Sequence, residues 1–132
     1  MTATDARTST ADDASASVPQ ERRLVTSIPG PRSVALQARK TSAVSAGVGV
    51  MLPVYIVRAG GGVLVDADGN SFIDMGSGIA VTTVGNANPE VVEGVQRQVA
   101  KFTHTCFMVT PYSGYVEVCE ALNRLTPGDH EK

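Results

Sequence analysis

The pattern of apolar and polar positions is most informative in residues 63–89, which read VLVDADGNSFIDMGSGIAVTTVGNANP. Two short apolar runs, 63–66 and 71–74, flank an Asp-Gly dipeptide, which supplies the positive φ that a tight hairpin turn needs. The pattern therefore predicts a β-hairpin. Another short strand is predicted over residues 55–58, and three consecutive glycines at 60–62 end it.

Helical signals lie on both sides of these strands. Pro31 suits the first turn of a helix, so residues 33–43 are predicted to be helical. The sequence at 88–90, Asn-Pro-Glu, is typical of a helix start, because it combines a capping side chain, a proline and an acid in the first turn. The apolar residues that follow recur at the helical period and form one face: Val91, Val92, Val95, Val99 and Phe102.

A last helix is predicted to begin near Thr110-Pro111 and to end at residues 126–128. Together the helices and the hairpin predict an α/β or α+β piece. No strand pattern follows Gly128 to complete a sheet, so we expect this piece to be incomplete as a stand-alone domain. The apolar stripe of the last helix, which we expect to be buried, consists of Tyr115, Val116, Cys119, Leu122 and Leu125.

Length and composition add a polar tail and exclude several classes of partner. Residues 1–20 are rich in Ala, Ser, Thr and Asp and are predicted to be a disordered tail, whereas residues 21–132 are predicted to be ordered. A net charge of −2 and the absence of Trp argue against nucleic acid as a partner. No run approaches the ~20 apolar residues of a membrane span, and the tail is no secretory signal. We expect a cytoplasmic protein with no membrane partner.

Cysteine and histidine offer little chemistry. The two cysteines, Cys106 and Cys119, match neither a zinc-ligand spacing nor a disulfide framework, so no metal site is predicted. We expect both thiols to be buried structural groups in a reducing compartment. His104 lies just past a predicted helix end, where a structural role is favoured and a catalytic pairing with Cys106 stays open.

The acidic and glycine-rich segments favour structural roles. Asp66, Asp68 and Asp74 cluster in the hairpin, where paired acids such as Asp66 and Asp74 are expected to bond to turn amides rather than act as acid and base. The Gly-x-Gly at 76–78 does not directly precede a helix, so a bend where the backbone closely approaches another surface is favoured over a nucleotide site.

None of the lysines has the setting of a Schiff-base lysine, because none lies in an apolar pocket that would lower its pKa. Two are expected at solvent-facing helix positions and the third is the last residue: Lys40, Lys101 and Lys132.

Several sequence pieces, taken in order, resemble the class III (ω-amino acid) aminotransferases, which depend on pyridoxal phosphate. The similarity is greatest to the 4-aminobutyrate aminotransferases of the actinobacterial type, and it covers about residues 22–128. The pieces are RRLVT at 22–26, IPGP at 28–31, GVGV at 47–50, DADGN at 66–70, GSGIAV at 76–81 and FTHTCFM at 102–108.

The resemblance implies an α/β fold, namely the N-terminal segment of a fold-type I pyridoxal-phosphate-dependent transferase, with a small-domain segment and the start of the large domain. By position, Ile79 matches an apolar residue that lines the amino-acid pocket, and Gly78 lets the backbone pass close to it. Met108 falls near the active-site mouth. These three residues are the substrate-binding candidates. The family's Gly-His-x-His-Pro is replaced by Gly-Asn-Ala-Asn-Pro at 85–89.

The resemblance also implies what the chain lacks. The family's phosphate-cradling segment, its pyridine-nitrogen Asp, its Schiff-base lysine and its carboxylate-binding Arg are expected after Lys132. Because cofactor chemistry needs these groups together, we expect no catalytic or cofactor-binding residue here, no pyridoxal phosphate bound by this chain alone, and no activity of the chain alone.

For the complete enzyme, the resemblance implies transfer of the amino group of 4-aminobutyrate to 2-oxoglutarate, giving succinate semialdehyde and glutamate, in a homodimer or larger homo-oligomer. Two alternatives stay open: a truncated, non-catalytic interaction piece, and one half of a split aminotransferase. The preferred ω-amino acid also stays open, because an apolar wall at Ile79 suits 5-aminovalerate or a β-amino acid as well.

Overall fold

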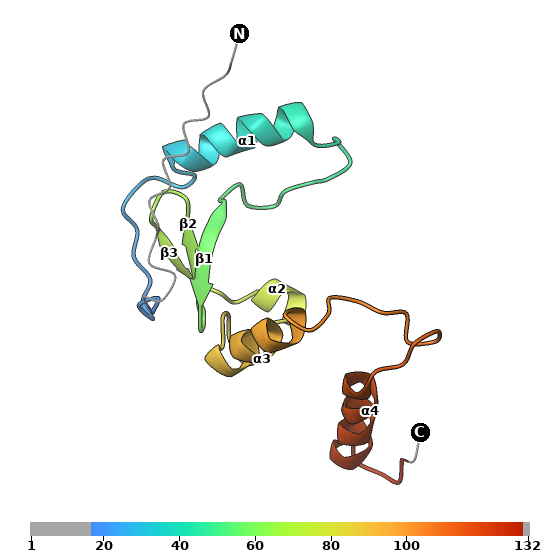
Figure 1. The fold of residues 1–132 in the computed structure, drawn as a ribbon. Coiled ribbons are helices and arrows are strands. Elements are labelled where there is room, and N and C mark those ends of the chain that lie inside the picture. The colour runs from blue at the N-terminus through green and yellow to red at the C-terminus, as the bar shows by residue number, and fades with distance from the viewer. Residues whose placement is uncertain (1–16, 131–132) are drawn as a thin grey trace. The chain divides into compact units, whose positions relative to one another are not determined.

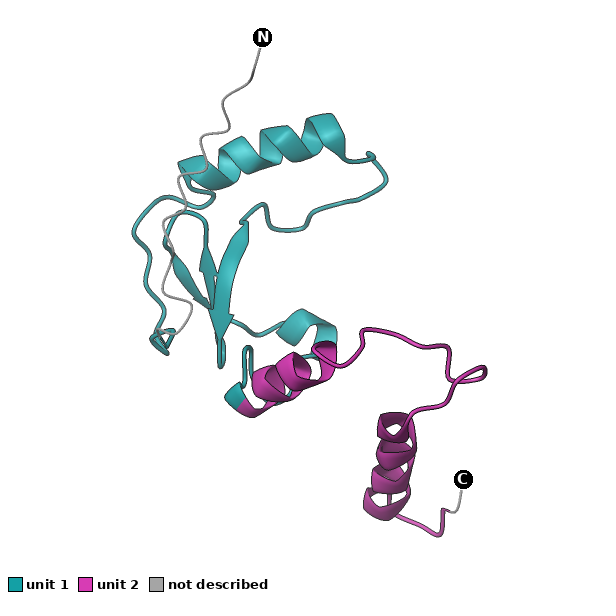
Figure 2. Ribbon diagram, viewed as in Figure 1, with its two compact units in different colours: residues 1–89 teal, residues 90–132 magenta. Residues whose placement is uncertain are grey.

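The computed structural model describes residues 17–130. The chain divides into two compact units, Met1–Pro89 and Glu90–Lys132 (Figure 2). Each unit is described by itself below. The predicted disordered tail falls mainly on residues 1–16, which lie outside the described part.

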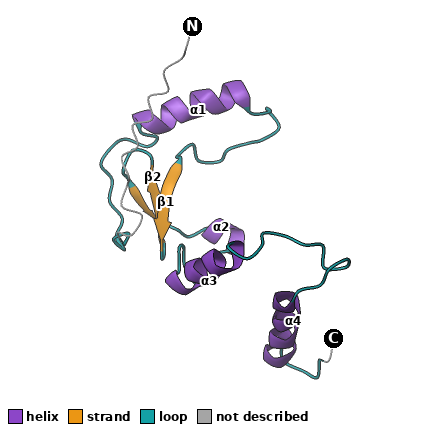
Figure 3. Cartoon of the chain, in the orientation of Figure 1, coloured by secondary structure: helices purple, strands orange, loops and turns teal. Residues whose placement is uncertain are grey.

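The first unit is built on a three-stranded antiparallel sheet in the order β1-β2-β3 (Figures 1 and 3). Its strands are β1 (Ile56–Gly60), β2 (Val63–Asp66) and β3 (Ser71–Ile73). The predicted hairpin of β2 and β3 is confirmed, with Gly69 at φ 89° in its turn. The predicted strand at 55–58 is displaced: it extends to Gly60, which pairs with Val63 and leaves a two-residue loop.

The centre of this unit is small and largely polar. Val63 is 1% exposed, and three polar side chains, Ser33, Asp66 and Asn70, are equally inaccessible. The Asn70 side-chain oxygen accepts hydrogen bonds from the backbone N–H groups of Val25 (2.8 Å) and Thr26 (3.0 Å). Buried polar groups need such partners. These bonds from the β2–β3 turn therefore hold residues 25–26, which precede α1, against the sheet.

Helix α1 (Pro31–Ala43) is confirmed, with proline at its start as predicted. Gly30 at its N-cap offers no side chain, and the cap comes instead from the β2–β3 turn. The Asp68 carboxylate accepts hydrogen bonds from the N–H groups of Arg32 (2.7 Å) and Ser33 (2.9 Å), which would otherwise lack partners at the helix end. A Cβ at Gly30 would lie 2.3 Å from Asp68 Cγ, so glycine is required for this close approach.

Residues 17–20, which the composition assigns to the tail, contact the sheet. Val18 is buried, at 7% exposure. The Gln20 side chain donates to the carbonyl of Gly60 (2.9 Å) and accepts from the N–H of Gly62 (3.0 Å). Specific bonds to the β1–β2 loop therefore order these four residues despite their polar neighbours.

The described part of the second unit includes α4 (Ser113–Leu125) and all of α3 (Pro89–Val99) except its first residue. The predicted start of α3 is confirmed. Helix α4 ends at Thr126 as predicted but begins later than Pro111, because Tyr112 at its N-cap has extended backbone. Aromatic rings pack in the connection, with the Phe107 ring centroid 5.5 Å from that of Tyr112 and 4.5 Å from that of Tyr115.

The prediction that the α4 stripe is buried is wrong. Within the described part of the second unit, no other helix packs on this stripe, and no residue of α3 or α4 is buried. Helical period identifies an apolar face but does not provide its cover. The exposed fractions are 52% for Tyr115, 45% for Val116, 57% for Leu122 and 72% for Leu125, and Cys119 is also exposed.

Candidate functional site

The most unusual backbone in the first unit is the short helical turn α2 (Ser77–Ala80), which we call the left-handed turn. All four of its residues have positive φ, between 48° and 65°. L-residues in this conformation lose about 1–2 kcal/mol each, because Cβ approaches the following carbonyl oxygen. Gly78 escapes this penalty, whereas Ile79, at φ 65° and ψ 59°, is β-branched and strongly disfavoured there.

Local hydrogen bonds hold the left-handed turn. The N–H of Ile79 donates to the carbonyl of Gly76 (2.8 Å), and the N–H of Val81 donates to the carbonyl of Ser77 (2.7 Å). The hydroxyls of Ser77 and Thr82 lie 2.7 Å apart. These bonds fix the strained backbone in one arrangement.

Asp74 supports the beginning of the turn. Its Oδ1 accepts hydrogen bonds from the N–H groups of Ser77 (2.7 Å) and Gly76 (3.1 Å), and its Oδ2 accepts from Asn86 Nδ2 (3.2 Å). The pKa of Asp74 is lowered, chiefly by the Ser77 N–H bond, against an opposing effect of partial burial. Asp66 likewise accepts bonds from the N–H groups of Asp68 and Asn70. The prediction that Asp66 and Asp74 bond to turn amides is therefore confirmed.

The left-handed turn presents Ile79 to solvent. This side chain is 95% exposed, so packing inside the first unit does not offset the strain of its backbone. A strained, non-glycine residue that gains nothing from burial points to a role outside the fold of its own unit.

Gly78 is required by conformation rather than by crowding. A Cβ added there would meet its nearest neighbour, Val81 Cβ, at 3.6 Å, which is ordinary contact. The predicted bend at 76–78 is confirmed. The close approach to another surface that was predicted with it is wrong within the described residues, since Val81 alone comes within 4 Å of this Cβ position. The positive φ of 60° is the feature that favours glycine.

Met108 is described within the second unit. It is 89% exposed and lies in a turn where the N–H groups of Val109 and Thr110 both donate to the carbonyl of Cys106. The structure thus brings Gly78 and Ile79 together in one turn of the first unit, whereas the third substrate-binding candidate belongs to the other unit.

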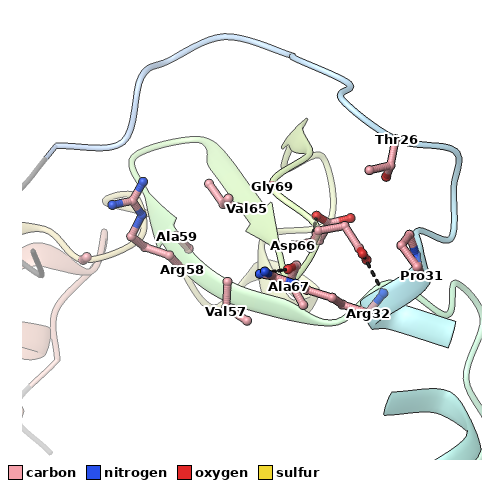
Figure 4. Close-up of a pocket in the computed structure, with 12 residues that line it drawn as sticks. Thr26, Pro31, Arg32, Val57, Arg58, Ala59, Val65, Asp66, Ala67 and Gly69 are labelled. Atoms are coloured by element: carbon pink, nitrogen blue, oxygen red, sulfur yellow. Dashed lines mark hydrogen bonds between the residues drawn. The ribbon is translucent and has the colours of Figure 1, made fainter. Parts of the chain in front are cut away.

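A cavity of about 730 Å³ in the first unit lies elsewhere, between the start of α1, strands β1 and β2, and the β2–β3 turn (Figure 4). Two of its polar side chains have partners: the Arg32 guanidinium donates to the carbonyl of Ala67 (3.1 Å), and Asp68 caps α1. Neither Gly78 nor Ile79 lines it. We interpret this cavity as a consequence of the α1 attachment, without a reactive group.

The remaining candidates differ partly from expectation. Lys40 was expected to face solvent, but it is half-buried, and its Nζ donates to the carbonyl of Val48. Lys101 and His104 are exposed. The prediction that both cysteines are buried is wrong: Cys106 and Cys119 are exposed, because the loop and the helix that carry them lack a covering element among residues 90–130.

The described residues do not fit pyridoxal phosphate by themselves. The backbone N–H groups of Gly76 and Ser77, which converge as an anion site would require, are occupied by the Asp74 carboxylate. The described lysines are Lys40, which is bonded to a carbonyl, and Lys101, which is exposed. Residues 17–130 therefore offer neither a free phosphate cradle in this turn nor a lysine in the setting of an imine-forming group.

Sequence reasoning did not predict the hydrogen bonds by which Asp74 joins the left-handed turn to Asn86. The bonds from Gly76 and Ser77 had a local signal, because aspartate side chains commonly accept bonds from the N–H groups two or three residues ahead. The hydrogen bond from Asn86 to Asp74 joins residues on either side of the left-handed turn, and no sequence signal indicated it.

Residues 43–132 match the family described as aminotransferase class-III. The chain is 66% identical over 117 residues to a 4-aminobutyrate aminotransferase of Mycobacterium tuberculosis, covering 89% of this chain and 26% of that protein. It is 43% identical over 97 residues to a 5-aminovalerate aminotransferase of Pseudomonas putida, covering 74% and 23%. The chain therefore spans about a quarter of the length of these relatives.

The fold is also similar to a solved structure, an omega-transaminase from Sphaerobacter thermophilus. The TM-score is 0.66 at 27% sequence identity, over 75% of this chain and 23% of that one. This partial match agrees with the expected segment of a fold-type I aminotransferase. Among residues 17–130, no helix is long and apolar enough to cross a membrane.

Proposed function

Because the chain belongs to the class-III aminotransferase family, we propose that it forms the N-terminal portion of a 4-aminobutyrate aminotransferase. The 66% identity to the Mycobacterium tuberculosis relative carries this proposal. The whole protein would transfer the amino group of 4-aminobutyrate to 2-oxoglutarate and yield succinate semialdehyde and glutamate. Its cofactor would be pyridoxal phosphate, held by residues outside those described here.

We propose that Ile79 is the contribution of the first unit to the substrate pocket. An exposed, strained isoleucine offers an apolar surface on a fixed backbone, which suits the methylene groups of an ω-amino acid. Gly78 allows the left-handed turn that presents Ile79. For Met108, which is exposed in the second unit, we separately propose a place near the active-site mouth of the complete enzyme.

The left-handed turn has no charged side chain, so it would select by shape and apolar character, and the neighbouring Asp74 is not free to bind the ends of the substrate. The Asp74 carboxylate is engaged by backbone and side-chain amides. The carboxylate and ammonium groups of 4-aminobutyrate would therefore bind residues elsewhere in the enzyme. The same reasoning admits 5-aminovalerate as a substrate, since one methylene group in an apolar pocket changes binding by only about 1–3 kcal/mol.

A second candidate role is association without catalysis. Helix α3 exposes Val91, Val95 and Val99 by 52–59%, and α4 exposes its whole apolar stripe. Such faces favour burial against protein. They would serve equally in a homo-oligomer of a complete cytoplasmic enzyme, in a truncated interaction piece, or in one half of a split aminotransferase.

A chimaeric enzyme tests the proposed function. The 117 matched residues of this chain replace their counterparts in the Mycobacterium tuberculosis relative, and glutamate formation from 4-aminobutyrate and 2-oxoglutarate is measured. The unmodified relative is the positive control, and the 132-residue chain alone, expected to be inactive, is the negative control. Turnover by the chimaera supports the proposal. A chimaera that binds pyridoxal phosphate but does not convert 4-aminobutyrate contradicts it.

A further inference from the structure

The Asp74 carboxylate lies between two elements of the first unit. One oxygen accepts both N–H groups at the beginning of the left-handed turn, at 2.7 Å and 3.1 Å. The other oxygen accepts the side-chain amide of Asn86, at 3.2 Å. Asp74 therefore joins the residues immediately before and shortly after the turn.

Asn86 is in turn fixed to the sheet. Its backbone N–H and carbonyl pair with the carbonyl and N–H of Gly61, each at 2.8 Å, and its side-chain amide also donates to that carbonyl at 3.3 Å. Gly85 approaches the same loop so closely that an added Cβ would lie 3.2 Å from Gly61 Cα. The β1–β2 loop is thus the rigid base to which the left-handed turn is connected.

The Ile79 side chain has no packing support within the first unit. It is 95% exposed, and the strained backbone of Ile79 relaxes unless the surrounding bonds prevent it. The orientation of Ile79 consequently depends on the bonds within the turn and on groups that fix its ends. The Asp74 carboxylate bonds at the beginning of the turn and to Asn86, and the Asp74 backbone N–H donates to the carbonyl of Gly62 in the β1–β2 loop (2.9 Å).

We propose that Asp74 is a positioning residue for substrate specificity: through Asn86 and the β1–β2 loop it holds the left-handed turn so that Ile79 faces the hydrocarbon chain of an ω-amino acid. The proposal rests on the proposed function, because it takes Ile79 to be part of the substrate pocket. Asp74 acts through Ile79 and touches neither substrate nor cofactor.

A double-mutant cycle separates this positioning role from general support of the fold. If Asp74 acts through Ile79, then Asp74→Ala and Ile79→Ala lower kcat/KM for 4-aminobutyrate in the same direction, by about 10–200-fold, the range expected for lost apolar contact. The double variant loses no more than the larger single loss. Asp74→Asn keeps a carbonyl oxygen for the two N–H groups but sets an NH2 donor opposite the Asn86 amide, so it is expected to lose activity to a smaller extent than Asp74→Ala. Losses that multiply, or an Asp74→Asn variant as impaired as Asp74→Ala, overturn the proposal.

The double-mutant cycle is measured in the chimaera. Nuclear magnetic resonance of the complete 132-residue chain independently tests the backbone conformation of residues 77–80. Scalar couplings and backbone chemical shifts report φ at residues 77–80. We expect positive φ in the unmodified chain, in Asp74→Asn and in the control Asp129→Ala, which removes an exposed acid of the second unit. We expect negative φ at Ile79 in Asp74→Ala.

The two arms distinguish the possible failures. Negative φ at 77–80 in the unmodified chain, or positive φ retained in Asp74→Ala, overturns the positioning role whatever the activity. An unmodified chimaera that binds pyridoxal phosphate without converting 4-aminobutyrate contradicts the proposed function. In that case the scalar couplings of the 132-residue chain still show whether Asp74 holds the left-handed turn.

Discussion

Replacing Ile79 with glycine is expected to stabilise the first unit, although it removes a large apolar side chain. Ile79 has φ 65° and ψ 59° within the left-handed turn and is 95% exposed. Glycine adopts this conformation without the steric conflict between Cβ and the carbonyl oxygen. The substitution therefore separates the strain of the backbone from the function of the side chain.

The magnitude follows from two opposing effects. Relief of the left-handed backbone stabilises the folded unit by about 1–2 kcal/mol. The greater freedom of glycine in the unfolded chain opposes this by about 0.5–1 kcal/mol. Because the Ile79 side chain is almost fully exposed, its removal loses almost no burial. We expect a net change between about 0 and 1.5 kcal/mol in favour of the folded unit.

Native-state hydrogen exchange of the β2 and β3 amides is the appropriate assay, since it reports the opening free energy of the first unit separately from the second. Met75→Gly is the matched control. Met75 is 89% exposed and lies just before the turn, and its φ is not positive. Glycine there is expected to destabilise by about 0.5–1 kcal/mol. If both glycine variants destabilise the unit equally, the strain assigned to Ile79 is refuted.

Three further outcomes are expected. Asn70→Ala should destabilise the first unit by about 2–4 kcal/mol, because it leaves the N–H groups of Val25 and Thr26 without their buried acceptor; a urea midpoint that does not change would contradict this. Acid should also destabilise it. Desolvation raises the pKa of Asp68, but bonds from the Ser33 hydroxyl and the Arg32 and Ser33 N–H groups, together with the Arg32 charge, lower this pKa overall. The pKa of Asp74 is lowered as well. The unfolded chain therefore takes up these protons first as pH falls through about 4, so the urea midpoint should decrease there and should change less in an Asp68→Asn, Asp74→Asn variant. Finally, Cys106 and Cys119 should both react with a thiol reagent at the rate of the unfolded chain, and slow labelling of either would show that it is covered.

Local sequence signals predicted much of the secondary structure. The hairpin of β2 and β3 depends on an Asp-Gly turn, and the starts of α1 and α3 depend on a proline, so a few neighbouring residues determine each of them. The exposure of the α4 stripe could not be predicted in this way, because burial depends on a partner surface rather than on helical period.

The candidate site was predicted by position but not by conformation. The sequence pointed to Gly78 and Ile79 as parts of a bend, yet isoleucine is among the residues least expected at positive φ. The bonds that hold the bend include the one from Asn86 to Asp74, and the cap of α1 comes from Asp68. Residues distant in sequence make such contacts, and residue preferences do not encode them.

The most direct test of the account compares Ile79, Ile79→Ala and Ile79→Gly in the chimaeric enzyme, with kcat/KM for 4-aminobutyrate as the measurement. If Ile79 is the apolar wall of the substrate pocket, both substitutions lower kcat/KM by about 10–200-fold, even though glycine leaves the first unit as stable as before or more stable. Unchanged kcat/KM in both variants would contradict the claim that the left-handed turn exists to present this side chain to the substrate.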